Sequence, residues 1–139
     1  MNAARASSTD PYGLLLTLDG YGAPQERCND HRLLKRVLTE LPFEIGMRIL
    51  DGPYTVEVDE PGIAGLSGFI FIIESHISIH TYAERGFVTV DVYSCKPFDA
   101  DVAIRFIGSS FELSSWETEL VKRGRRFNAS PPFRPQSWP

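Results

Sequence analysis

Residues 74–81 read Glu-Ser-His-Ile-Ser-Ile-His-Thr and bring serine, histidine and glutamate within a few positions of one another. Serine hydroxyls act as nucleophiles when a base is near, and imidazole has a pKa close to neutral, so these residue types suit nucleophilic and acid–base chemistry. Short Ser/His motifs also arise by chance, and a plainer interpretation puts these groups on the solvent face of a β-strand. A zinc site at His76 and His80 is a weaker alternative. That spacing unites two ligands on a helix, whereas the intervening isoleucines favour a strand.

Strands on either side of this segment must position it. Apolar runs and period-two alternation, bounded by Gly and Pro, predict seven strands along the chain. The predicted strands cover residues 13–18, 47–50, 54–58, 65–73, 76–80, 87–94 and 113–121. The run 65–73 is almost continuously apolar, which is typical of a central strand, and it ends at the reactive segment.

Two helices are expected between the strands. Asn29 or Asp30 can cap the first, whose apolar residues recur at helical spacing until Pro42 stops the pattern. Asp99 can cap the second. Because both helices must bury an apolar stripe, the economical fold is α+β. It is a two-layer sandwich, with a mainly antiparallel sheet and two helices on one face.

The overall composition excludes several classes of protein. A chain of 139 residues with 42% apolar and 23% charged residues suits one globular domain, expected over residues 1–123 before a Pro-rich tail at 124–139. A net charge of −4 argues against nucleic acid or an anionic membrane as the partner. No apolar run approaches the roughly 20 residues of a membrane span, and residues 1–8 lack a secretory segment, so the default expectation is a cytoplasmic location. Cys28 and Cys95 are expected to be free thiols.

Three separate elements occur together in this chain. They are residues 65–68 (Gly-Leu-Ser-Gly), residues 74–81 and residues 91–95 (Asp-Val-Tyr-Ser-Cys). In these elements and their spacing the chain resembles the prokaryotic S-adenosylmethionine decarboxylases, a family of pyruvoyl enzymes, over most of residues 13–123. Three elements in register are much harder to obtain by chance than one Ser/His tripeptide. The resemblance therefore favours a reactive segment over a solvated strand face.

The resemblance implies that the chain cleaves itself between Glu74 and Ser75. The Ser75 hydroxyl would attack the Glu74 carbonyl and convert the amide to an ester. His80, five positions further on, would remove the α-proton of residue 75, and elimination followed by hydrolysis would leave a ketone and release ammonia. Ser67 would assist by hydrogen-bonding the intermediate. The products would be a β chain of 74 residues and an α chain of 65 residues that begins with a pyruvoyl group.

The resemblance also implies the catalytic step. The ketone would hold the substrate amine as a Schiff base and accept the electrons left by departing carbon dioxide, so neither metal nor PLP is required. Cys95, twenty positions beyond Ser75, would return the proton. Without the matching spacing, a small core residue would be the simpler interpretation of Cys95. Glu84 would hold ribose hydroxyls of the substrate, with a surface glutamate in a turn as an equal alternative. Cys28 matches nothing catalytic.

The identity of the substrate is less clearly indicated. Relatives that use S-adenosylmethionine commonly stack adenine on an aromatic residue shortly before the Gly-x-Ser-Gly element, and residues 56–64 contain none. Tyr54, Phe43 or Phe69 could supply the ring from elsewhere. Three carboxylates near this stretch would equally suit the cationic end of arginine or ornithine. The main prediction is an S-adenosylmethionine decarboxylase of polyamine (spermidine) biosynthesis, and an arginine or ornithine decarboxylase on the same scaffold is the alternative.

The expected partners are a small-molecule substrate and a second copy of the chain. Family resemblance implies a homodimer of processed αβ protomers whose sheets pack together, with sites near the interface. A second alternative to the enzyme is an inactive homologue that no longer cleaves and acts as a regulatory partner. The presence of Ser75, His80 and Cys95 argues against that alternative.

Overall fold

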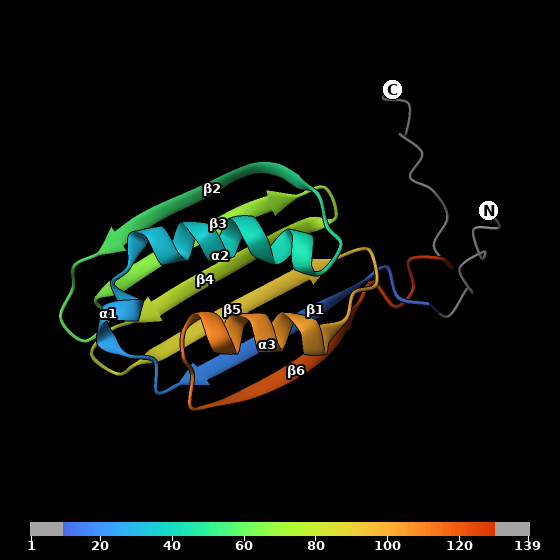
Figure 1. The fold of residues 1–139 in the computed structure, drawn as a ribbon. Helices are drawn as coiled ribbons and strands as arrows, with labels where there is room; N and C mark the ends of the chain where they lie inside the picture. The colour runs from blue at the N-terminus through green and yellow to red at the C-terminus, as the bar shows by residue number, and fades with distance from the viewer. Residues whose placement is uncertain (1–9, 130–139) are drawn as a thin grey trace, which may run out of the picture.

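The computed structural model describes residues 10–129 and arranges them as one antiparallel sheet with helices against one face (Figure 1). The strands are β1 (Gly13–Tyr21), β2 (Ile49–Val58), β3 (Gly65–Ile72), β4 (Ser75–Tyr82), β5 (Phe87–Ser94) and β6 (Ser115–Arg123). Their order across the sheet is β2-β3-β4-β5-β1-β6. The helices are α1 (Gln25–Cys28), α2 (His31–Glu44) and α3 (Ala100–Ser110). The reactive segment thus occupies β4, inside the sheet.

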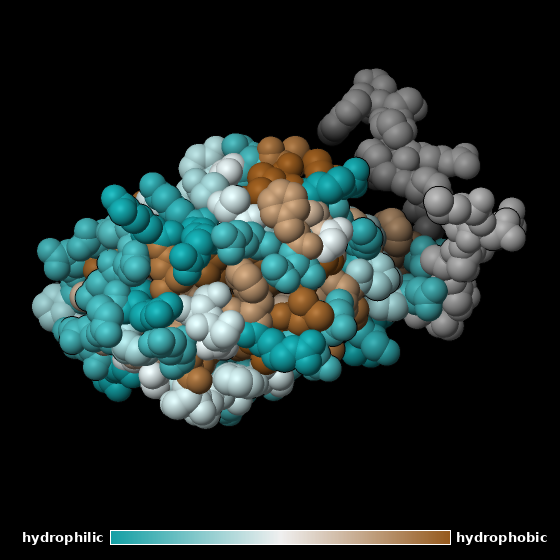
Figure 2. Space-filling view, in the orientation of Figure 1, coloured by the Kyte–Doolittle hydropathy of each residue, from teal (hydrophilic) through white to brown (hydrophobic). Residues whose placement is uncertain are grey.

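Alternation along the strands gives the sheet a buried face beneath α2 and α3. Successive strand residues point to opposite faces, so the isoleucines of β4 share one face and its histidines the other. The fully buried side chains of this core include Ile70, Ile77, Ile79, Val92, Leu34, Val37, Leu38, Leu41 and Ile107. Figure 2 shows the helix-covered side, where hydrophilic side chains surround scattered hydrophobic ones.

The opposite, open face of the sheet exposes apolar side chains on β2 and β3. Tyr54 lies opposite Phe69 across the two strands, and Val56 lies opposite Ser67, so these residues share the open face. Tyr54, Val56, Phe69 and Phe71 are all exposed to solvent. A cluster of exposed apolar side chains on a sheet is typical of an interaction surface.

The α+β two-layer sandwich with an antiparallel sheet and a helix layer on one face is confirmed. Both expected caps are present. The Asp30 carboxylate accepts a hydrogen bond from the Leu33 N–H at 3.0 Å, and the Asp99 carboxylate accepts one from the Asp101 N–H at 3.0 Å. Each cap satisfies a backbone donor that has no partner inside its helix.

Three expectations about the elements are wrong. The helix α1 was not expected, because four residues are too few to produce a periodic pattern. Pro42 lies inside α2 and does not end it; near a helix C-terminus a proline removes one hydrogen bond without disturbing a following turn. Residues 47–50 and 54–58 do not form two strands. Most of them belong to β2, which continues through a register irregularity between Ile49 and Tyr54.

The beginning of the expected tail packs beside the start of β1. The Tyr12 N–H donates to the Gly124 carbonyl at 3.1 Å, and the rings of Tyr12 and Phe127 lie 4.6 Å apart. The rest of the expected tail, residues 130–139, and the N-terminal residues 1–9 lie outside the described residues. Within residues 10–129, no helix combines the length and apolar character needed to cross a membrane.

Candidate active site

The Glu74–Ser75 peptide bond lies at a tight hairpin turn. Ile72 pairs with Ser75 across β3 and β4, which leaves Ile73 and Glu74 as a two-residue connection. Two-residue hairpins favour Gly, Asn or Asp because central residues need positive φ. Here neither central residue is one of these, and the positive φ falls instead on Ser75, at 154°. A non-glycine residue in such a region costs about 1–3 kcal/mol, so the backbone is strained directly after the bond that is predicted to break.

The carbonyl of Glu74 is held by the backbone N–H of the residue that directly follows β5. The Cys95 N–H donates a hydrogen bond to this carbonyl oxygen at 2.8 Å. A donor in this position stabilises negative charge that develops on the oxygen when a nucleophile attacks the carbonyl carbon. The Cys95 side chain is exposed, whereas Cys28 is buried, and burial raises the pKa of the Cys28 thiol. The family resemblance implied a role for the Cys95 thiol, but nothing in the sequence indicated a role for its backbone amide.

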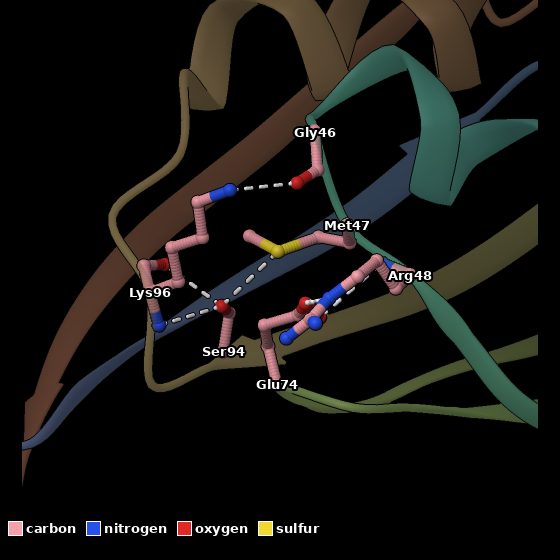
Figure 3. A network of polar contacts seen from close by, with 6 residues as sticks. All are labelled: Gly46, Met47, Arg48, Glu74, Ser94 and Lys96. Atoms are coloured by element: carbon pink, nitrogen blue, oxygen red, sulfur yellow. Dashed lines mark hydrogen bonds and ion pairs between the residues drawn. The ribbon is translucent and has the colours of Figure 1, made fainter.

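The side chain of Glu74 points inward and is paired with Arg48 (Figure 3). Its carboxylate is 5% exposed, accepts from the Arg48 Nε at 3.2 Å and accepts from the Arg48 backbone N–H at 3.3 Å. Burial would raise the pKa of Glu74, but these hydrogen bonds outweigh burial and the pKa lies below its ordinary value. The carboxylate is therefore ionised at neutral pH. No motif in the sequence indicated a role for Arg48.

A cavity of about 630 Å³ lies beside Cys95. Tyr12 and Phe127 form part of its lining, together with Lys96 and Lys122. The pKa of Tyr12 lies above its ordinary value. The largest cause is a hydrogen bond to the Cys95 side chain, and the next is the charge of that side chain. Tyr12 therefore stays a neutral donor at neutral pH. The thiol of Cys95 thus lies between a phenol and open space large enough for a small molecule.

Ser67 and His80 form a second cluster on the open face of the sheet. They pair across β3 and β4, with Ser67 Oγ and His80 Nδ1 2.7 Å apart. The rings of Tyr54 and Phe69 lie 5.3 Å apart beside them, and all four residues line a cavity of about 340 Å³. Phe43 does not belong to this cluster, because it projects from α2 with 69% of its surface exposed.

The structure does not bring His80 to Ser75 within one chain. The two residues lie five positions apart on β4, which corresponds to about 17 Å at a rise of about 3.3 Å per residue. That separation is far beyond hydrogen-bond distance. We call Glu74, Ser75 and Cys95 the turn cluster, and Ser67 and His80 the sheet cluster.

Glu84 lies at the same end of the sheet as His80. It is exposed in the turn of residues 83–86, which connects β4 to β5. His76 and His80 lie four positions apart on one strand, about 13 Å, which is too far to share a zinc ion. No group of three or more His, Cys, Asp and Glu side chains suited to hold a metal ion occurs within residues 10–129.

Both the structure and the sequence match proteins of one class, the decarboxylases. The structure is similar to the crystal structure of the adenosylmethionine decarboxylase from Aquifex aeolicus, with a TM-score of 0.72 and 26% sequence identity over 83% of this chain and 92% of that chain. The sequence profile of the S-adenosylmethionine decarboxylase family matches residues 14–124. The chain belongs to this family.

Curated relatives carry the same family name. A protein of Caldicellulosiruptor saccharolyticus named S-adenosylmethionine decarboxylase proenzyme is 31% identical over 75% of this chain and 82% of its own length. Proteins with the same name from Geobacillus sp. and Symbiobacterium thermophilum are 27% and 37% identical, over 84% and 60% of this chain and 91% and 61% of their own lengths. The word proenzyme in these names describes relatives that are made as precursors.

Proposed function

We propose that this chain is a proenzyme that cleaves itself between Glu74 and Ser75 and then decarboxylates S-adenosylmethionine, supplying the decarboxylated product for polyamine synthesis. The family, the proenzyme names of its relatives and the fold support this proposal. The observation that carries it is the turn cluster, in which a strained serine follows a carbonyl held by the Cys95 amide.

The turn cluster suits an acyl shift from nitrogen to oxygen. The Ser75 Oγ attacks the Glu74 carbonyl carbon, a C–O bond forms, the C–N bond breaks, and the nitrogen takes the hydroxyl proton. The Cys95 N–H stabilises the oxygen anion formed on the way. Breaking the peptide bond also releases the strained φ of Ser75. A base then removes the α-proton of residue 75, the bond between Cβ and Oγ of residue 75 breaks, and Glu74 leaves with this oxygen in its new main-chain carboxylate, which becomes the C-terminus of the β chain.

Hydrolysis of the product of that elimination turns residue 75 into a pyruvoyl group with release of ammonia. The residues around this position fit such a group. Residue 75 pairs with Ser94, so the new ketone would lie one residue from Cys95 and its cavity. A pyruvoyl group here supplies a carbonyl carbon for the substrate amine and an acceptor for electrons. Cys95 provides a thiol proton close by, and Tyr12 holds that thiol through its hydroxyl.

Cys95→Ala is expected to separate cleavage from turnover. The substitution keeps the backbone N–H on the Glu74 carbonyl and removes only the thiol, so cleavage should stay within about twofold of wild type while kcat falls about 10²- to 10⁴-fold. Gel analysis of cleavage beside carbon dioxide release from the processed protein measures the two effects. Cys28→Ala, which removes the buried thiol, is the matched control and should retain both. Loss of cleavage equal to that of Ser75→Ala would show that the role of Cys95 is misassigned.

The proposal includes a homodimer in which the sheet cluster of one subunit serves the turn cluster of the other. One chain cannot join them, because about 17 Å of β4 separates His80 from Ser75. A two-fold axis that crosses β4 between these residues would pack two open sheet faces together and place each turn cluster opposite a sheet cluster. The exposed Tyr54, Val56 and Phe71 provide apolar surface for such packing.

The same arrangement suggests where the substrate base binds. Tyr54 and Phe69 present paired rings next to Ser67 and His80, and aromatic faces of this kind stack on adenine. The Tyr54 hydroxyl donates to the Asp51 carboxylate at 2.8 Å, which orients its ring. This bond also raises the pKa of Tyr54, so the ring stays neutral at physiological pH. These residues replace the aromatic that residues 56–64 lack.

Carbon dioxide release from carboxyl-labelled substrates tests the proposed reaction. The processed protein is incubated separately with S-adenosylmethionine, arginine and ornithine, and release is expected from S-adenosylmethionine alone. Release only from arginine or ornithine would overturn the substrate assignment and support the alternative decarboxylase. A single full-length species that persists by intact mass after long incubation would instead support the inactive homologue.

A further inference from the structure

The segment that leads into β2 contacts both residues of the hairpin connection that precedes Ser75. The Arg48 carbonyl accepts a hydrogen bond from the Ile73 N–H at 2.9 Å. The Arg48 backbone N–H and its Nε both donate to the Glu74 carboxylate, at 3.3 and 3.2 Å respectively. One residue therefore binds both central residues of the hairpin connection. Two of these contacts use the Arg48 backbone, and one uses its side chain.

Glu74 is unusually placed for a charged residue at a hairpin turn. Side chains at such turns ordinarily point into water, but the Glu74 carboxylate is 5% exposed while the Arg48 side chain is 74% exposed. A buried carboxylate is costly unless it is paired, so Arg48 makes the inward position possible. With its side chain fixed inward, Glu74 also has its carbonyl fixed toward the Cys95 amide.

The same segment also reaches the chain on the other side of Cys95. The Gly46 carbonyl accepts from the Lys96 Nζ at 2.9 Å. The Ser94 hydroxyl donates to the Lys96 carbonyl at 2.7 Å and lies 3.5 Å from the Met47 sulfur. Residues 46–48 thus contact the end of β5, which Cys95 directly follows, as well as the turn that contains the Glu74 carbonyl (Figure 3).

We propose that Arg48 is a positioning residue for self-cleavage. By holding the Glu74 carboxylate, Arg48 fixes the carbonyl against the Cys95 N–H and maintains the positive φ of Ser75. Without the guanidinium, the Glu74 carboxylate loses its charged partner and keeps only the backbone N–H of residue 48 from this pair of contacts, so the two-residue connection can relax and carry the carbonyl away from its donor. A shift of about 1 Å at a reacting group costs about 10²-fold in rate. This inference rests on the proposed self-cleavage.

Arg48→Ala is expected to slow cleavage by about 10- to 100-fold. Freshly synthesised precursor is followed by gel and intact mass, and the half-time of cleavage is compared with wild type. Arg48→Lys should recover part of the rate, because an ammonium can pair with Glu74 but does not reproduce the guanidinium geometry. Arg27→Ala is the matched control, since Arg27 pairs with Glu112 at 3.3 Å away from the turn, and it should cleave at the wild-type rate.

A second measurement separates positioning from general loss of structure. In a His80→Ala background the ester should accumulate, because its α-proton is not removed, and hydroxylamine cuts such esters. Adding Arg48→Ala is expected to lower the hydroxylamine-cleaved fraction at matched times severalfold, because Arg48 acts on ester formation. Thermal unfolding midpoints are measured on all variants. A lower ester fraction in Arg48→Ala/His80→Ala chains that melt like His80→Ala supports positioning.

Two results would overturn this inference alone. In the first, wild type cleaves and Arg48→Ala cleaves equally fast. In the second, the ester forms normally in Arg48→Ala/His80→Ala, so that Arg48 does not act on the acyl shift. A wild-type chain that never cleaves would overturn the proposed function together with this inference.

Discussion

Ser75→Ala is expected to leave the chain whole and without decarboxylase activity. Alanine has no hydroxyl to attack the Glu74 carbonyl, so neither ester nor pyruvoyl group can form. Intact mass should show one species near the 15.6 kDa of the full chain, where wild type gives fragments of 74 and 65 residues. In wild type the 65-residue fragment should also fail to react with amine-directed reagents at its first residue, because the amine has left as ammonia.

The matched control for this substitution is Ser109→Ala. Ser109 lies exposed on α3, where its hydroxyl only donates to the Phe106 carbonyl, so the variant should cleave and turn over like wild type. Two outcomes would contradict the proposal. One is a cleaved Ser75→Ala chain, and the other is a wild-type fragment that begins at residue 75 with an ordinary serine amine.

Co-expression of Ser75→Ala with His80→Ala is expected to restore cleavage that neither variant shows alone. In a mixed dimer of the proposed kind, the intact Ser75 of the His80→Ala subunit would face the intact His80 of the Ser75→Ala subunit. With random pairing about half of the His80→Ala chains enter mixed dimers, so about half should be cleaved. Differently tagged subunits allow the cleaved chain to be identified by mass, and decarboxylation should appear with it.

The doubly substituted chain, Ser75→Ala/His80→Ala, gives the opposite and equally specific result. Co-expressed in equal amount with wild type, it should block cleavage of about half of the wild-type chains, because their Ser75 then faces an alanine in the partner subunit. If each chain cleaves with its own His80, the wild-type chains are cleaved fully and the first pair of variants shows no rescue. Those two observations together would exclude the shared site.

Much of the fold could be predicted because its signals are local. Alternation of Ile77 and Ile79 with polar neighbours predicted β4 and its buried face. Asp99 was predicted to cap its helix, and Asp30 was one of two predicted caps of the other, with Asn29 as the alternative. The errors have equally local causes. Pro42 is an interruption only if the helix must continue far beyond it, and the irregular part of β2 resembles a turn because Gly52 and Pro53 lie within it.

The sequence by itself determined the fold class, which depends on local order and spacing. It also carried the motifs whose resemblance to the decarboxylase family implied the bond expected to break and the residues expected to break it. Only the tertiary structure decided which groups meet. Arg48 reaches Glu74 across 26 positions, the Cys95 amide meets the Glu74 carbonyl, and His80 is kept from Ser75. The physical reason is strand geometry: an extended chain separates its own near neighbours along one direction, while the sheet brings distant segments side by side through hydrogen bonds.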